Sequence, residues 1–237
     1  MVSKESKGCL HMDYDKIGER VKALYDRDYS ISYRKSDELV IKSDVFSQYN
    51  SLLKSVCKKF TKKIDVLDIG CGTGRYFHCL ENVTKLTGID ISESMIECAS
   101  LPVKAELVMY EVELMVGNVF DMSFESESFN LIYSIGVFGE HSPFDAFICN
   151  KLYTWLRPEG ILLFTTVDSS SKQKGIKRRI AESILPFWFQ KILNQRRGYF
   201  YMQTEELKRI MVKSPFKEFK LFKIEDIHVH DVCVATK

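Results

Sequence analysis

A chain of 237 residues has the length of one sizeable domain with a single hydrophobic core, and it leaves little room for a second full domain. Hydrophobic residues make up 45% of the chain and charged residues 28%, proportions that exclude a disordered or fibrous protein. The 34 Lys and Arg side chains nearly balance the 32 Asp and Glu, and a net charge of +2 gives no support for nucleic-acid binding.

Neither a targeting segment nor a metal site is expected. Residues 1–16 contain no apolar stretch typical of a secretion signal, and no run approaches the ~18 apolar residues that span a bilayer. Seven scattered cysteines without a CxxC pair indicate free thiols in a reducing compartment, and no group of residues has metal-ligand spacing. We therefore expect a cytoplasmic protein that binds no metal.

The N-terminal part is predicted to be helical. Apolar spacing predicts helices over 14–25 and 38–60, which would form a helical cap within residues 1–60. From residue 64 onward, short β-rich runs alternate with helical ones, as is typical of a doubly wound parallel sheet. Residues 61–167 are expected to form this core.

Five strands are predicted in the core from apolar and β-branched runs, and they cover 64–69, 85–90, 112–117, 129–135 and 161–167. Helices are expected over 75–82, from an N-cap at Ser92 or Ser94, and over 143–156 with Pro143 in the first turn. The sequence RPEG at 157–160 predicts a turn. The stretch 101–112 fits either a helix or a strand, and both stay open.

At the start of the C-terminal part, the alternation of strand and helix patterns stops and the composition changes. Residues 168–203 mix basic side chains with bulky aromatics, and we expect a lid inserted after the fifth strand, although an amphipathic packing helix fits equally well. Residues 204–237 are expected to form a closing helix over 204–212, capped by Thr204, and two strands. These strands, 219–227 and 228–236, are joined too tightly for a parallel crossover and must form an antiparallel hairpin.

The most specific motif is VLDIGCGTG at 66–74, in which the first strand runs directly into a glycine-rich turn. Glycines allow the backbone to turn sharply and to approach a ligand closely. Twenty residues after Gly70 the second strand ends at Asp90, whose carboxylate is suited to accept hydrogen bonds from ribose hydroxyls. Together these features indicate a nucleoside-type ligand. A ligand-free tight connection, with Asp90 as an ordinary N-cap, is the alternative.

The spacing of the glycines separates two classes of nucleotide-binding protein. A dinucleotide fingerprint, G-x-G-x-x-G, needs glycine where this chain has Arg75. With VLDIGCGTG the chain resembles the class I S-adenosylmethionine-dependent methyltransferases, over residues 60–167 and more loosely over the closing hairpin. The resemblance implies an α/β fold with a Rossmann-like seven-stranded mixed sheet, whose antiparallel last strand lies beside the fifth. It also implies S-adenosyl-L-methionine as cofactor and S-adenosyl-L-homocysteine as product.

The same resemblance implies roles for residues at the ends of the first two strands. Asp90 would hold the ribose, and Ile91 would cover one face of the adenine. Asp68 would lie near the amino group of the methionine part of the cofactor. Four residues in all would line that part: Asp68, Gly70, Cys71 and Gly72.

The resemblance continues after the third and fourth strands. Asn118 stands where the family usually has an aspartate that meets the adenine amino group, and its side-chain carbonyl can accept the same hydrogen bond. Val119 would lie beside it, while Ser134 and Ile135 would lie near the sulfonium. A simple role for Asn118 as a turn residue stays open.

Methyl transfer needs little catalytic machinery, because a sulfonium is an excellent leaving group and the protein has mainly to align the acceptor. A base becomes useful if the acceptor is a hydroxyl. The candidate base is His141, in the loop after the fourth strand, and its neighbour Glu140 is a second candidate. The alternative for His141 is a loop residue that caps a helix or faces water.

Three functions compete. The first is a small-molecule methyltransferase, a monomer or homodimer, whose acceptor pocket is covered by the N-terminal helices and the lid. The aromatic and basic residues of the lid suit an aromatic or anionic acceptor. The second is an enzyme that modifies RNA or protein through the basic lid, although nucleic acid is disfavoured by the balanced charge. The third is a cofactor-binding protein without catalysis.

Overall fold

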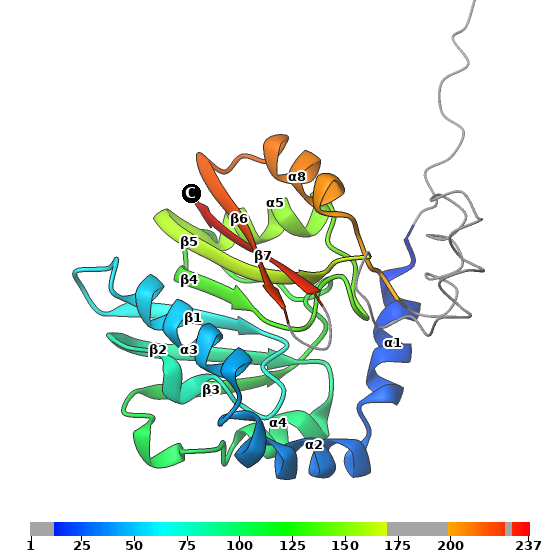
Figure 1. Cartoon of the computed structure of the whole chain (residues 1–237), viewed down its shortest axis with the longest axis vertical. Helices are drawn as coiled ribbons and strands as arrows, with labels where there is room; N and C mark the ends of the chain where they lie inside the picture. The colour runs from blue at the N-terminus through cyan, green and yellow to red at the C-terminus, as the bar shows by residue number, and fades with distance from the viewer. Residues whose placement is uncertain (1–11, 170–198, 226–228) are drawn as a thin grey trace, which may run out of the picture.

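The computed structural model describes residues 12–169, 199–225 and 229–237, and its centre is a seven-stranded sheet (Figure 1). The strand order is β3-β2-β1-β4-β5-β7-β6. The strands are β1 (Ile64–Ile69), β2 (Val83–Asp90), β3 (Glu111–Val116), β4 (Phe129–Ser134), β5 (Leu156–Val167), β6 (Glu218–Glu225) and β7 (Val229–Thr236). The first five strands are parallel, and β7 runs antiparallel between β5 and β6. This confirms the predicted Rossmann-like mixed sheet and its closing hairpin.

Helices cover both faces of the sheet. The helices are α1 (Tyr14–Leu24), α2 (Arg27–Val40), α3 (Asp44–Cys57), α4 (Glu93–Ala99), α5 (Ala146–Trp155) and α8 (Thr204–Val212). One face packs against α3, where Leu53 and Val56 join a buried cluster with Val66 and Leu131. The other face packs against α5 and α8. Meanwhile α1 and α2 lie beyond the carboxyl ends of the parallel strands (Figure 1).

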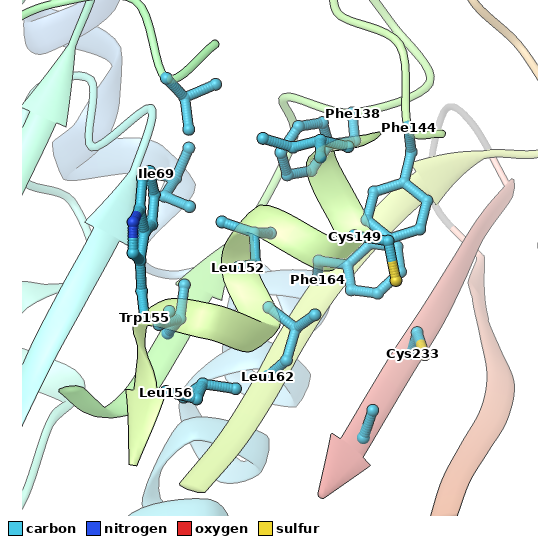
Figure 2. Packing of buried hydrophobic residues seen from close by; sticks show 14 of the residues in the cluster. Ile69, Phe138, Phe144, Cys149, Leu152, Trp155, Leu156, Leu162, Phe164 and Cys233 are labelled. Carbon is cyan, nitrogen blue, oxygen red and sulfur yellow. The ribbon is translucent and has the colours of Figure 1, made fainter. Parts of the chain in front are cut away.

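The α5 side of the sheet holds a dense apolar core (Figure 2). Leu152 and Trp155 of α5 are almost fully buried, and they pack with Leu162 and Phe164 of β5. The ring of Phe164 stacks on Phe144 with 4.0 Å between ring centroids. Because burial of each large apolar side chain contributes roughly 1.5–3 kcal/mol, this core holds the carboxyl ends of β1, β4 and β5 in a fixed arrangement.

The N-terminal cap contains three helices where two were predicted. Ser43 begins a new helix, because its side chain accepts a hydrogen bond from the backbone N–H of Phe46, and the predicted helix 38–60 is therefore interrupted. The missing helix, α2, begins at the N-cap Asp26. Its buried positions are Ser30 and Asp37, which are polar. A search for apolar periodicity could not find a helix with such an inner face.

The predicted helix 75–82 is absent, and a single 3-10 turn, η1 (Phe77–Cys79), follows the glycine-rich turn. Helix α3 occupies this part of the sheet face, since Phe77 and Cys79 lie in the same buried cluster as Leu53. The ring of Phe46 from α3 also stacks on Tyr76, with 5.4 Å between centroids. The segment therefore packs as a short turn beneath α3.

Several element boundaries also differ from those predicted. Residues 157–160 are the start of β5, with an irregular register opposite β4, and do not form a separate turn. Helix α5 begins three residues after Pro143, because the side chain of Asp145 caps it at Ile148. In the stretch left open, a 3-10 turn (Ala105–Leu107) precedes β3. Thr204 does not cap α8, since its hydroxyl bonds the carboxylate of Asp231.

Most of the predicted lid, residues 168–203, lies outside the described residues, as do its basic side chains. Residues 168–169 and 199–203 are described, and they meet in an isolated bridge between Asp168 and Met202. Where helices are described, none is both long and hydrophobic enough to cross a bilayer. The six cysteines in the described ranges are free thiols, as predicted.

Candidate functional site

The glycine-rich turn after β1 has a backbone that only glycine adopts easily. Gly70, Gly72 and Gly74 have φ angles of 68°, 55° and 73°. A Cβ atom at Gly70 would lie 2.2 Å from Cγ2 of Val137, so no side chain fits there. At Gly72 the same test finds nothing within 4 Å, and the backbone faces open space. The turn therefore exposes its main chain to a ligand.

Hydrogen bonds bring Asp90, at the end of β2, against this turn. The N–H groups of Gly70 and Cys71 both donate to the carbonyl of Ile89, at 2.8 and 2.9 Å. One carboxylate oxygen of Asp90 accepts from the N–H of Gly72 and the other from the N–H of Ser92, both at 2.9 Å. Burial raises the pKa of Asp90 while these N–H groups oppose the rise.

A pocket of about 820 Å³, including the space at its mouth, opens beside Asp90 and the turn. Its floor is formed by the turn and by the ends of β1 and β2, and its walls by the loops after β3 and β4. Helix α1 contributes Ile17, Gly18 and Val21, and α2 contributes Tyr33. The mixture of apolar walls with a few polar groups is typical of a small-molecule site.

The structure brings together eight of the twelve residues predicted for the site. The pocket is lined by Gly70, Gly72, Asp90, Ile91, Asn118, Val119, Ile135 and His141. The other four are not among the lining residues, but each is a neighbour in the sequence of a residue that is. They are Asp68, Cys71, Ser134 and Glu140. No finding tests ligand contact by any of them, and their roles stay predictions.

Three residues outside the lining support the turn from below. The hydroxyl of Ser134 donates to the carbonyl of Ile69 at 3.0 Å and is fully buried. Cys71 directs its thiol toward Gly88 on the next strand. Asp68 is buried and pairs with Tyr133 on the neighbouring strand β4. Burial raises the pKa of Asp68 to about 8, and the Tyr133 hydroxyl opposes this rise. An uncharged carboxyl beneath the turn is the consequence near neutral pH.

Asn118 makes a turn interaction and also lines the pocket. Its side-chain oxygen accepts a hydrogen bond from the N–H of Phe120 at 3.2 Å, which is a turn interaction. The same side chain lines the pocket, where it faces Gly18 of α1. A Cβ atom at Gly18 would lie 2.8 Å from the Asn118 amide nitrogen. Helix α1 therefore closes this end of the pocket by close approach at a glycine.

His141 lies at the pocket wall between two tyrosine rings. The ring of Tyr25 meets it edge-on with 6.0 Å between centroids, and the ring of Tyr199 is tilted at 5.5 Å. Its Nε2 atom is 4.0 Å from Oε1 of Glu140, whose pKa is raised by burial. The two predicted bases are thus adjacent, and His141 is the one that reaches the pocket.

Sequence reasoning expected the N-terminal helices to cover the pocket, but it missed helix α2 and the tyrosines that line the site. Tyr25 and Tyr33 both line the pocket, and Tyr29 joins their rings into a row with centroid distances of 5.2 and 5.9 Å. The available signal was the four-residue spacing of the three tyrosines, since Tyr29 and Tyr33 lie on one side of α2 and Tyr25 directly precedes its N-cap. Because helix α2 was not predicted, this spacing could not be interpreted as one side of a helix.

A comparison with protein families finds one matching model, described as a methyltransferase domain, over residues 60–214. The malonyl-[acyl-carrier protein] O-methyltransferase of Priestia megaterium is 32% identical over 180 residues, which cover 72% of this chain and 61% of that protein. The demethylmenaquinone methyltransferase of Lactococcus lactis is 24% identical over 206 residues, which cover 82% of this chain and 78% of that protein.

Among solved structures, the fold is similar to that of a phosphoethanolamine N-methyltransferase from Haemonchus contortus in complex with phosphomonomethylethanolamine and S-adenosylhomocysteine. The TM-score is 0.66 at 16% identity, and the match covers 95% of this chain and 60% of that one. The chain thus spans about three fifths of the length of the Priestia relative and of the Haemonchus structure.

Proposed function

Because the chain belongs to the class I S-adenosylmethionine-dependent methyltransferase family, we propose that it transfers a methyl group to an oxygen or nitrogen atom of a small-molecule acceptor. The observation that carries this proposal is the pocket in which the Gly72 backbone and the Asp90 carboxylate meet beneath α1. S-adenosyl-L-methionine, the cofactor of the family, supplies a methyl group bound to a sulfonium. An in-line nucleophile attacks this methyl group, and the sulfur leaves as S-adenosyl-L-homocysteine.

The pocket offers suitable partners for each part of this cofactor. Asp90 would hold the ribose, because each of its oxygens accepts one backbone N–H and has a further lone pair for a hydroxyl. Asn118 would meet the adenine edge between the apolar side chains of Ile91 and Val119. Open space at Gly72 leaves room for the methionine part, whose positively charged amino group would favour the ionised form of Asp68 below the turn.

His141 would act on the acceptor. It lies on the pocket wall beyond Ile135, on the side away from Asn118 in the order of the sheet. An imidazole has the pKa needed to take a proton from a hydroxyl near neutral pH. Glu140, 4.0 Å from its Nε2, would stabilise the positive charge that results. With a neutral amine as acceptor, placement alone would suffice.

A small molecule is the acceptor that the shape of the site supports. The pocket is roofed by α1 and by Tyr25 and Tyr33, so the reacting atoms would lie in a recess and not on an open surface. The relatives named above differ in the acceptors that their names state, one linked to a carrier protein and one a quinone. The acceptor of this chain is therefore best found by a screen that includes aromatic and anionic compounds.

The test is a transfer assay with a labelled methyl group. Phenols, amines, carboxylic acids, a malonyl thioester and a demethylated quinone would be offered to the wild-type chain and to His141→Ala. We expect turnover of at least one hydroxyl or amine, and a fall in kcat of about 10²-fold in the variant with a hydroxyl acceptor. Binding of the cofactor without transfer to any class would contradict the proposal and favour a non-catalytic binding protein.

A further inference from the structure

Asp37 of α2 is a fully buried carboxylate that no part of the site analysis explains. Buried carboxylates persist only when they are paired and hydrogen-bonded. Its Oδ2 accepts from the hydroxyl of Thr73 at 2.6 Å, and its Oδ1 accepts from Nε of Arg75 at 2.6 Å. Thr73 lies within the glycine-rich turn and Arg75 directly follows it, so both partners belong to the segment 73–75. One side chain of α2 thus binds that segment through both of its oxygens.

Arg75 makes a second contact that reaches the pocket. Its guanidinium lies over the ring of Tyr33, with Cζ 4.4 Å from the ring centroid. Tyr33 precedes Asp37 by one helical turn and lines the pocket. The pair of Asp37 and Arg75 therefore fixes the pocket wall as well as the turn. A planar guanidinium serves both contacts at once, which an ammonium group cannot do.

The glycine-rich turn needs such a contact in this chain. In a doubly wound sheet the turn normally leads into a helix, whose first backbone turn holds it. Here only the three-residue η1 follows, and the expected helix is absent. The other side of α2 contacts the end of α4, where Nε and Nη2 of Arg34 both donate to the carbonyl of Leu101 at 3.3 Å. Helix α2 can therefore act as an anchor for the turn.

We propose that Asp37, Thr73 and Arg75 are positioning residues for the cofactor site, with α2 replacing the missing helix as the support of the glycine-rich turn. The inference rests on the proposed function, because it concerns the same pocket. Its consequence follows from linkage. If the docked α2 holds the turn in the form that binds, bound cofactor must in return stabilise the docking of α2.

The test compares Asp37→Asn and Thr73→Val with the wild-type chain and with Ser30→Ala as a matched control. Asp37→Asn keeps the size of the side chain and removes its charge. Ser30 is also buried on α2, but its hydroxyl bonds the carbonyl of Asp26 within the helix. At a temperature where all variants are folded, we expect the Kd for S-adenosylmethionine to rise about tenfold or more in Asp37→Asn, several-fold in Thr73→Val, and not in Ser30→Ala.

Hydrogen exchange of α2 gives a readout that a purely structural role would leave unchanged. Added S-adenosylmethionine is expected to slow amide exchange over 27–40 in the wild-type chain and in Ser30→Ala, and to have little effect in Asp37→Asn. Reduced stability of Asp37→Asn with an unchanged Kd would overturn this inference and leave the proposed function standing. If Asp37→Asn does not fold, an unchanged Kd in Thr73→Val would overturn it as well. Absence of binding by the wild-type chain would overturn the proposed function and this inference together.

Discussion

At the scale of single residues, Asp90 connects the glycine-rich turn, β2 and the start of α4. Its two oxygens hold the N–H groups of Gly72 and Ser92, and the hydroxyl of Ser92 donates in turn to the carbonyl of Tyr25 at 2.6 Å. The carboxylate therefore organises the turn and also faces the pocket. Loss of this one group would affect binding by two routes, the geometry of the turn and the proposed contact with ribose.

Asp90→Ala is expected to weaken binding of S-adenosylmethionine by about 10²-fold, since hydrogen bonds to a charged group contribute roughly 1.5–3 kcal/mol each. Asp90→Asn keeps an acceptor oxygen and should lose less affinity. Glu93→Ala removes a nearby exposed acid on α4 and is the control. Equal affinity of Asp90→Ala and the control, measured by calorimetric titration, would remove the ribose assignment.

Asp68 gives the site a dependence on pH. Its folded-state pKa of about 8 lies above that of an unfolded aspartate, so the folded chain holds this proton more tightly. The free energy of unfolding should therefore fall as pH rises from about 4 to about 8. Asp68→Asn carries no titrating group and should remove this part of the fall.

Urea unfolding at pH 5, 6, 7 and 8 measures the effect. The slope for the wild-type chain is expected to be steeper than for Asp68→Asn, by up to about 1.4 kcal/mol per pH unit. Asp90, whose pKa is also raised by burial, adds the same trend to both proteins. The exposed Asp121→Asn should leave the wild-type slope unchanged. Parallel slopes for wild type and Asp68→Asn would show that the carboxyl is ionised throughout this range.

At the scale of elements, α1 closes one end of the pocket through Gly18. Alanine is the better residue inside a helix by roughly 1 kcal/mol, so Gly18→Ala should keep or raise the melting temperature. Its Cβ atom, however, would lie 2.8 Å from the amide nitrogen of Asn118. That amide is the end of a side chain and can move, and we expect its displacement to raise the Kd for S-adenosylmethionine several-fold.

The exposed Glu19→Ala on the same helix changes helix propensity without touching the pocket, and it serves as the control for Gly18→Ala. A melting curve and a titration on each variant separate stability from affinity. If Gly18→Ala bound the cofactor as tightly as Glu19→Ala, close approach of α1 to Asn118 would have no part in recognition.

The elements that sequence predicted well are those whose apolar pattern is almost continuous. Strand β1 was found with its boundaries, because its buried apolar residues are interrupted only by Asp65 and Asp68 and the glycine-rich turn follows directly. Helix α2 was missed because its buried face carries Ser30 and Asp37, which lower the apolar periodicity. A polar inner face has meaning only once its partners, Thr73 and Arg75, are known to lie opposite it.

At the scale of the whole molecule, the fold class and the cofactor pocket followed from one motif and its spacing. VLDIGCGTG and Asp90 predicted two elements that the structure indeed places within hydrogen-bond distance. Cover by the N-terminal helices was expected as well, but the residues that form it could not be predicted in the same way. It is formed by side chains from α1, α2 and the loop after β4, and their meeting depends on tertiary packing between segments far apart in the chain.

The packing of the sheet also explains why the pocket is already formed. Cores on both faces hold the carboxyl ends of β1 and β4, while α1 and α2 are joined to the sheet through Asn118, Ser92 and Asp37. Binding to such a site should stabilise the folded chain by mass action.

Isothermal titration of the wild-type chain with S-adenosylmethionine tests the central claim most directly. The account predicts one binding site per chain with a Kd on the order of micromolar and a negative heat-capacity change from burial of the adenine against Ile91 and Val119. S-adenosylhomocysteine should bind at the same site and compete. A titration without binding heat at millimolar ligand and at two temperatures would contradict the account.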